Sequence, residues 1–265
     1  MLRIIFLFII LIPSSALAIN FDGNFIQGHF IIGKTQPKTE IWIDKKKVKV
    51  TKDGYFVFGI GRDRKYDIVI TSKKDGEKTK IVKKIQKRKY KIQRIDGLPE
   101  KKVTPPPEVY ERIKRENKII ANARAIESDL TFFKKKFIAP LENAIITGVY
   151  GSQRILNGKP KWPHYGIDFA AKEGTKIKAM LDGTATMVEP DLFYTGGTLI
   201  FDHGHGISTL YMHMQKINVK KGQKVKQGDI IGTVGSTGRS TGPHLDVRLN
   251  WFGTRLDPAV VLKLN

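Results

Sequence analysis

The residues best suited to chemistry in this chain are its histidines, five of which lie within residues 137–265. The chain has no cysteine, so disulfides, thiolate metal sites and a cysteine nucleophile are excluded. A metal ion would therefore be bound by histidine, aspartate or glutamate. The same imidazoles can also transfer protons near neutral pH.

Three short segments of this region alternate between apolar residues and residues that could bind a metal or move a proton. In an extended strand, successive side chains point to opposite faces, so each segment can pack its apolar residues and present its polar ones on the other side. The polar residues of the three segments are His164 and Asp168, then Tyr211 and His213, and then His244, Asp246 and Arg248. If the three polar faces line one groove, that groove contains three histidines and two aspartates.

This set of nitrogen and oxygen donors suits Zn²⁺, with Mn²⁺ or Fe²⁺ as alternatives. A catalytic zinc needs three protein ligands and lowers the pKa of its bound water to about 7. His164, Asp168 and one of His244 or Asp246 can supply the ligands, and the remaining histidines can handle protons. Arg248 could contact a substrate carboxylate or brace Asp246.

In their order and spacing these residues resemble the signature of the LytM/lysostaphin-type zinc endopeptidases. The resemblance is carried by His164-x-x-x-Asp168, by Tyr211-Met212-His213 and by the run Ser-Thr-Gly-Pro-His-Leu-Asp at 240–246, and it extends over residues 145–260. Enzymes of this family hydrolyse peptide bonds in peptidoglycan. The resemblance therefore implies a zinc-dependent endopeptidase that acts on peptidoglycan during cell-wall remodelling.

The resemblance also implies a role for each site residue. His164 and Asp168 match the metal ligands of the first motif, while His213 and His244 match catalytic histidines that assist a metal-activated water. The family's last ligand is the second histidine of a His-x-His motif, and that position holds Asp246 here. Aspartate oxygens bind Zn²⁺ at about 2.0–2.2 Å, so we expect Asp246 to be the third ligand. A His-Asp-Asp set should polarise the bound water less, because ligand charge offsets metal charge.

A non-catalytic alternative stays open. A LytM-like domain that has lost its metal could instead activate a partner peptidoglycan amidase, and Asp246 is the feature that favours this alternative. The retention of His164, Asp168, His213 and His244 favours the enzyme.

Three zones must position these residues, and their patterns predict a mainly β protein. Residues 19–100 alternate short β-type runs with Asp-Gly turns, which predicts a small, basic, Ig-like antiparallel sandwich. Residues 101–136 combine a proline-rich linker with apolar residues at helical spacing, which predicts one amphipathic helix over about 107–134 that covers one of its neighbours. Residues 137–265 are rich in glycine and β-type runs and predict a compact antiparallel sheet that forms the LytM-like peptidase domain.

The N-terminus and the net charge indicate where the protein works. Residues 1–18 combine Arg3, nine apolar residues at 4–12 and Ala16-Leu17-Ala18, a pattern typical of a signal peptide. We therefore expect export to the periplasm or cell envelope. The formal net charge of +22 favours an anionic partner, and in that compartment this means the wall or a membrane surface, contacted through the basic N-terminal domain. Nucleic acid is not expected, because export and the lack of interleaved aromatic stacking motifs argue against it.

Overall fold

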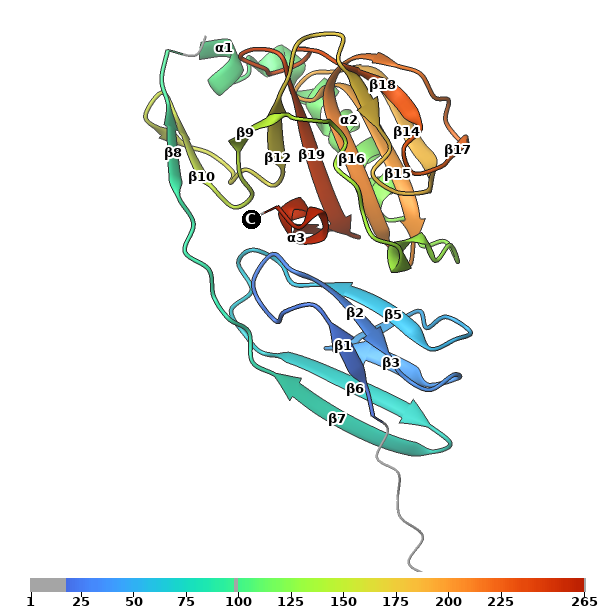
Figure 1. Cartoon of the computed structure of the whole chain (residues 1–265). Helices are drawn as coiled ribbons and strands as arrows, with labels where there is room; N and C mark the ends of the chain where they lie inside the picture. The colour runs from blue at the N-terminus through green and yellow to red at the C-terminus, as the bar shows by residue number, and fades with distance from the viewer. Residues whose placement is uncertain (1–17, 98–99, 265) are drawn as a thin grey trace, which may run out of the picture.

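The computed structural model describes residues 18–97 and 100–264 (Figure 1). The predicted signal peptide spans residues 1–18, and residues 1–17 lie outside the described part. Two β regions follow one another along the chain, and the short helix α3 (Pro258–Leu262) lies between them. Within the described residues, no helix is long and apolar enough to cross a membrane.

The N-terminal region is a small antiparallel β-sandwich. One sheet has the order β1-β2-β5 and the other the order β4-β3-β6-β7. Buried residues of both sheets, among them Phe56 and Phe58 from one and Ile41 and Ile70 from the other, belong to one hydrophobic cluster. The strands are β1 (Asn20–Asp22), β2 (Phe30–Lys34), β3 (Glu40–Ile43), β4 (Lys46–Val48), β5 (Tyr55–Gly59), β6 (Ile68–Lys74) and β7 (Glu77–Lys83). The mainly β, sandwich-like fold predicted for this region is confirmed.

The C-terminal region is built on a ten-stranded antiparallel sheet, whose main order is β17-β14-β15-β16-β19-β12-β9. Its strands are β9 (Ile145–Gly148), β12 (Ile167–Ala170), β13 (Lys176–Lys178), β14 (Gly183–Leu192), β15 (Gly196–Gly204), β16 (Ile207–Ile217), β17 (Lys224–Val225), β18 (Ile230–Val234), β19 (His244–Trp251) and β20 (Thr254–Leu256). The predicted antiparallel sheet is therefore confirmed. The central strand β15 is buried along its whole length, and α2 (Tyr110–Arg124) covers one side of the sheet.

The predicted amphipathic helix covers the C-terminal sheet, but it is shorter than the sequence indicated. Ile119, Ile120 and Ala123 of α2 pack against apolar residues of β14, β15 and β16. The expected helix over 107–134 is instead a 3₁₀ turn (Pro107–Val109), then α2, and a second 3₁₀ turn (Phe132–Lys134). Between α2 and the second turn, the backbone carbonyls of Glu127 and Ser128 accept hydrogen bonds from Lys49 and His205. These long-range hydrogen bonds take the place of the backbone bonds of a helix, so the helix ends before the apolar sequence pattern does.

The end of the predicted N-terminal domain forms a strand that the sequence did not reveal. β8 (Ile92–Ile95) runs parallel to β10 (Gln153–Leu156), which pairs in turn with β11 (Lys159–Pro160). The short helix α1 (Glu100–Val103) follows β8. The predicted boundaries at 100 and 136 stay predictions, and β8 lies on the N-terminal side of the first one while pairing with the C-terminal region.

Candidate metal centre

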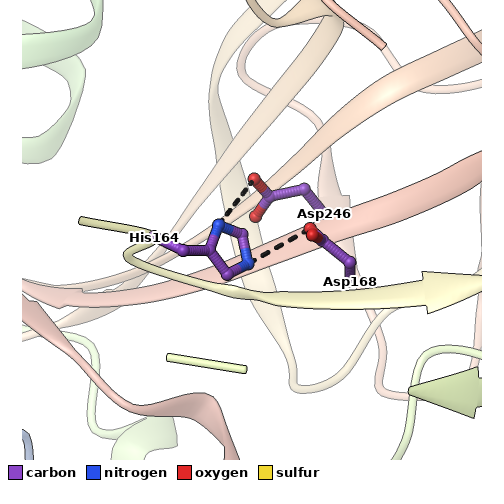
Figure 2. A group of neighbouring side chains, drawn as sticks. All are labelled: His164, Asp168 and Asp246. Atoms are coloured by element: carbon purple, nitrogen blue, oxygen red, sulfur yellow. Dashed lines mark ion pairs between the residues drawn. The ribbon is translucent and has the colours of Figure 1, made fainter. Parts of the chain in front are cut away.

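Three buried side chains converge beside the neighbouring strands β12 and β19 of the C-terminal sheet. His164, Asp168 and Asp246 each offer one ligand atom, and these atoms all lie within 4.8 Å of one another. The Nε2 of His164 is 3.2 Å from Oδ1 of Asp168, and its Nδ1 is 4.0 Å from Oδ2 of Asp246 (Figure 2). The structure thus brings together the three residues that the sequence predicted as metal ligands.

Strand register accounts for the position of the two carboxylates. Asp168 on β12 and Asp246 on β19 are directly paired in an antiparallel ladder, so their side chains leave the same face of the sheet as neighbours. The alternation predicted for 244–249 is confirmed, because Leu245, Val247 and Leu249 are fully buried on the other side of β19.

His164 reaches the site by a different route from the one predicted. β12 begins only at Ile167, so His164 lies before the strand and not on it. Its backbone N–H donates to the carbonyl of Ser152, and its carbonyl accepts from the N–H of Gly151. Backbone hydrogen bonds to residues 151 and 152 therefore place the imidazole. The prediction that His164 lies near Asp168 is correct, but the predicted cause, alternation along a strand, is wrong.

The polar atoms of this cluster are incompletely satisfied by the protein. Both ring nitrogens of His164 and Oδ1 of Asp168 are buried without a hydrogen-bond partner. A buried polar atom left without a partner costs about 1–3 kcal/mol. A cation bound between these atoms would satisfy the carboxylate oxygen and one imidazole nitrogen at once. The donor set, one imidazole and two carboxylates without thiolate, fits Zn²⁺.

Two arginines hold the carboxylates. Arg154 donates to Oδ2 of Asp168 at 3.1 Å, and Arg248 donates to both oxygens of Asp246, at 2.9 and 3.2 Å. Burial alone would raise the pKa of Asp246, but the charges of Arg248 and His164 hold this pKa well below its usual range. Of the two roles open to Arg248, the structure thus shows the brace on Asp246. No motif in the sequence marks Arg154, because its position is set only by tertiary packing.

The two remaining predicted residues, His213 and His244, lie beside this cluster. Their ring centroids are 4.7 Å apart, and Nε2 of His244 is 4.0 Å from Oδ1 of Asp168. The Nδ1 of His213 lies 2.8 Å from the carbonyl of Thr237, and that of His244 lies 2.8 Å from the carbonyl of Gly242. Because a carbonyl can only accept, each Nδ1 carries a proton and each Nε2 is the basic nitrogen of the neutral ring.

His213 owes its orientation to an irregularity in β16. Its φ is 62°, its N–H donates to the carbonyl of Thr195, and the ladder with β18 shifts register just beyond it. Such irregularities re-aim a side chain. The prediction that Tyr211 shares the polar face is wrong: Tyr211 is fully buried, and its hydroxyl accepts from the N–H of Met180. Residues 207–214 of this strand are all buried, so neither of its faces is exposed there. Burial also lowers the pKa of His213 to about 4, which leaves the imidazole neutral at pH 7.

A groove of about 330 Å³ opens beside these side chains. Asp168, His213, His244 and Asp246 all line it, but His164, which the sequence also predicted to line the groove, does not. A larger groove of about 780 Å³ lies between the N-terminal sandwich and the end of β19, and none of these four residues lines it.

Two glycines make room for the carboxylates. A Cβ on Gly166 would lie 2.3 Å from Oδ1 of Asp246, and one on Gly148 would lie 2.2 Å from Oδ2 of Asp168. Real Cβ atoms do not approach other atoms so closely, so any larger residue would displace a ligand. Neither glycine carries a signal in the sequence, because the clash arises between segments far apart in the chain.

We expect Gly166→Ala to lower zinc affinity about 10–100-fold, the range typical of disturbed ligand support. The measurement is competition for zinc against a chelator of known affinity. Gly253→Ala is the matched control, since a Cβ there meets nothing within 4 Å. Unchanged zinc affinity in a folded Gly166→Ala protein would contradict a role for Asp246 as ligand.

Comparison with known proteins places this site in a family. Residues 162–258 match Peptidase family M23. Over 87 residues the chain is 46% identical to the peptidoglycan DD-endopeptidase ShyA of Vibrio cholerae, an alignment covering 33% of this chain and 20% of the relative. It is 41% identical over 98 residues to the DD-carboxypeptidase/endopeptidase Mpg of Neisseria meningitidis, covering 37% and 22%. The chain thus spans about a fifth of the length of these curated relatives.

A solved structure extends the similarity beyond the site. The crystal structure of a putative peptidase M23 from Pseudomonas aeruginosa superposes with a TM-score of 0.70 at 25% identity, covering 90% of this chain and 95% of the other. The similarity therefore includes the N-terminal sandwich as well as the C-terminal sheet. The segment of this chain that matches peptidase family M23, residues 162–258, contains His164, Asp168, His213, His244 and Asp246.

Proposed function

We propose that this protein is a zinc-dependent endopeptidase that hydrolyses peptide bonds in peptidoglycan. The observation that carries the proposal is the convergence of His164, Asp168 and Asp246, with unsatisfied buried donor atoms, beside the paired imidazoles of His213 and His244. The names of the relatives ShyA and Mpg support peptidoglycan as the substrate. Such a substrate places the protein in the cell envelope, in agreement with the predicted export signal.

The residues of the site divide into metal ligands and proton carriers. Zinc held by His164, Asp168 and Asp246 would supply the Lewis acidity that activates a water for attack on a peptide carbonyl. His213 and His244 each donate Nδ1–H to a backbone carbonyl, which fixes the ring and leaves Nε2 as the base. Between them they accept the proton given up by the water and return one to the departing amine.

The arginines adjust the charge of the proposed ligand set. Two carboxylates and one neutral imidazole carry two negative charges, but the charges of Arg154 and Arg248 lie directly against those carboxylates. The electron-donating effect of the second carboxylate is thereby reduced. Weaker polarisation of the water, expected from the sequence alone, is offset in part by these two ion pairs.

The test combines metal content with product analysis. The protein is purified without added metal, its zinc is quantified, and purified peptidoglycan sacculi are digested before and after chelation. We expect about one zinc per chain and products with new amino and carboxyl ends at a peptide bond, lost on chelation and restored by zinc. Absence of both zinc and peptide products would contradict the proposal.

A second candidate function is regulation without catalysis. The Asp246–Arg248 pair favours it, because a carboxylate already bound by a guanidinium is less available to a metal. In that case the protein would hold no zinc, and it would increase digestion of sacculi by a partner peptidoglycan amidase. The zinc measurement separates the two functions.

We also propose that the N-terminal sandwich binds the anionic wall or a membrane surface through the outer face of its four-stranded sheet. Lys73 is paired directly with Lys78 on β7 and with Glu40 on β3, and Thr71 is paired with Lys80, so three exposed lysines and one carboxylate share this face. Like charges directly opposite each other destabilise a sheet, and an anionic polymer would relieve this repulsion. The proposed binding to an anionic wall or membrane surface thus involves a specific face of the sandwich.

Replacing Lys73, Lys78 and Lys80 with glutamine is expected to weaken retention on sacculi several-fold at low salt. The difference should shrink at 0.5 M salt, because exposed charges are screened there over only a few ångströms. Retention is measured by sedimentation with sacculi. The matched control replaces three exposed lysines of the C-terminal region, Lys220, Lys221 and Lys224, with glutamine. Equal losses in the two triple variants would show that net charge, and not this face, is responsible.

A further inference from the structure

One wall of the groove beside Asp168 and His244 comes from β8, which connects the sandwich to the C-terminal region. Gln93 and Ile95 of β8 line the groove together with Arg154 and Leu156 of β10. The parallel ladder pairs Gln93 with Arg154 and Ile95 with Leu156, which fixes the four residues relative to one another. The segment that connects the two β regions therefore completes a surface that faces Asp168 and His244.

This wall holds two buried polar atoms without a protein partner. They are Oε1 of Gln93, an acceptor, and Nε of Arg154, a donor. Arg154 already uses Nη2 to hold Asp168, so the ion pair leaves Nε unsatisfied. An unsatisfied acceptor beside an unsatisfied donor matches a ligand that offers both an N–H and an oxygen, as a peptide does.

A second arginine lines the same groove from the loop before β19. The guanidinium of Arg239 stacks 4.3 Å from the ring centre of Tyr194. Burial lowers the pKa of Arg239, and the positive charges of Arg154 and Arg248 lower it further. The guanidinium groups of Arg154 and Arg239 thus line one small groove, and a carboxylate is the ligand that a guanidinium binds through two parallel hydrogen bonds.

We propose that the groove wall formed by Gln93, Arg154 and Arg239 is a substrate subsite that binds a free carboxylate of the peptide being cleaved. The two arginines bind the carboxylate, and Gln93 accepts a hydrogen bond from a substrate N–H. This inference rests on the proposed function, since it names a chemical feature of the same substrate: a peptide carrying a free carboxylate near the scissile bond. An amidated or otherwise neutral peptide lacks that feature.

The test measures binding in the absence of turnover. Zinc-depleted protein is titrated calorimetrically with the synthetic stem peptide L-Ala-γ-D-Glu-L-Lys-D-Ala-D-Ala and with the same peptide carrying amides in place of its carboxylates. Without zinc, a carboxylate cannot gain affinity by binding the metal. We expect the acid form to bind about tenfold more tightly, as charge-assisted hydrogen bonds to guanidinium allow.

Variants assign the effect to the subsite. Arg239→Gln should remove most of the preference for the acid form, and Gln93→Leu should weaken both forms a few-fold. Arg94→Gln is the matched control, because Arg94 is the exposed neighbour of Gln93 on β8 and does not line the groove. Circular dichroism confirms that each variant is folded.

Equal binding of the two peptides to the wild-type protein would overturn the subsite, and this comparison requires no variant. A preference for the acid form that Arg239→Gln leaves intact would overturn the assignment to these residues. If the protein binds the acid peptide more tightly but its zinc-loaded form does not cleave the peptide, the proposed endopeptidase activity is wrong and the proposed subsite stands. If the zinc-loaded protein cleaves the peptide but binds both forms equally, the subsite is wrong and the endopeptidase activity stands. The two proposals can therefore fail separately.

Discussion

Asp246→Asn is expected to abolish zinc retention and to lower the rate of peptidoglycan digestion by at least about 100-fold. The change keeps the shape of the side chain but removes the anionic donor, leaving His164 and Asp168 as the two remaining protein ligands. A catalytic zinc ordinarily has three. Zinc is quantified in the purified variant by mass spectrometry, and digestion is followed with labelled sacculi.

The matched control for this substitution is Asp75→Asn. Asp75 occupies an exposed turn between β6 and β7 at φ 50°, a conformation that asparagine also tolerates. It should retain zinc and activity. If Asp246→Asn kept a full complement of zinc, Asp246 would not be a ligand, and its pairing with Arg248 would be purely structural.

The ion pair between Asp246 and Arg248 allows a second test of Asp246 as a ligand. In the Asp246→His protein, the family's usual ligand type is present, but Arg248 loses its carboxylate partner and leaves a positive charge beside the new ligand. Removing one partner of a buried ion pair is destabilising, because the other charge stays uncompensated. The double variant Asp246→His with Arg248→Gln should therefore bind zinc more tightly and melt at a higher temperature than Asp246→His alone. If the double variant bound zinc more weakly and melted at a lower temperature than Asp246→His alone, Arg248 would not act through Asp246.

His213→Ala and His244→Ala are expected to lower the rate of digestion by about 10²–10⁴-fold each while retaining zinc. This range is typical for the loss of a general acid or base. Neither histidine belongs to the cluster of ligand atoms, and each is held by a backbone carbonyl at Nδ1. Zinc content and sacculus digestion are measured on the same preparations.

The combination of readouts separates the two proposed roles. A ligand variant loses zinc and rate together, whereas a proton-carrier variant loses rate alone. His29→Gln, which changes the histidine of the N-terminal sandwich, is the control for loss of an imidazole elsewhere. If His213→Ala lost its zinc as fully as Asp246→Asn, His213 would be a ligand and its assignment as a proton carrier would be wrong.

The sequence predicted the fold class through local signals. Asp-Gly turns and β-type runs indicated the sandwich, and residues Asp75 and Gly76 do form the positive-φ turn that joins β6 to β7. The alternation along 244–249 placed His244, Asp246 and Arg248 on one face of β19 because that strand has one apolar side and one polar side. The same logic failed for Tyr211, since its strand is buried on both sides, and for His164, since its segment is not a strand.

By itself, the sequence determined which residues could bind a metal and that they occur in the order of a known peptidase signature. Motif spacing and residue chemistry are properties of the chain, so they can be read without coordinates. Only the tertiary structure decided that Arg154 and Arg248 neutralise the two carboxylates, that Gly148 and Gly166 leave space for them, and that β8 completes the groove. Each of these depends on contacts between segments distant in sequence, which arise only when the sheet register brings those segments together.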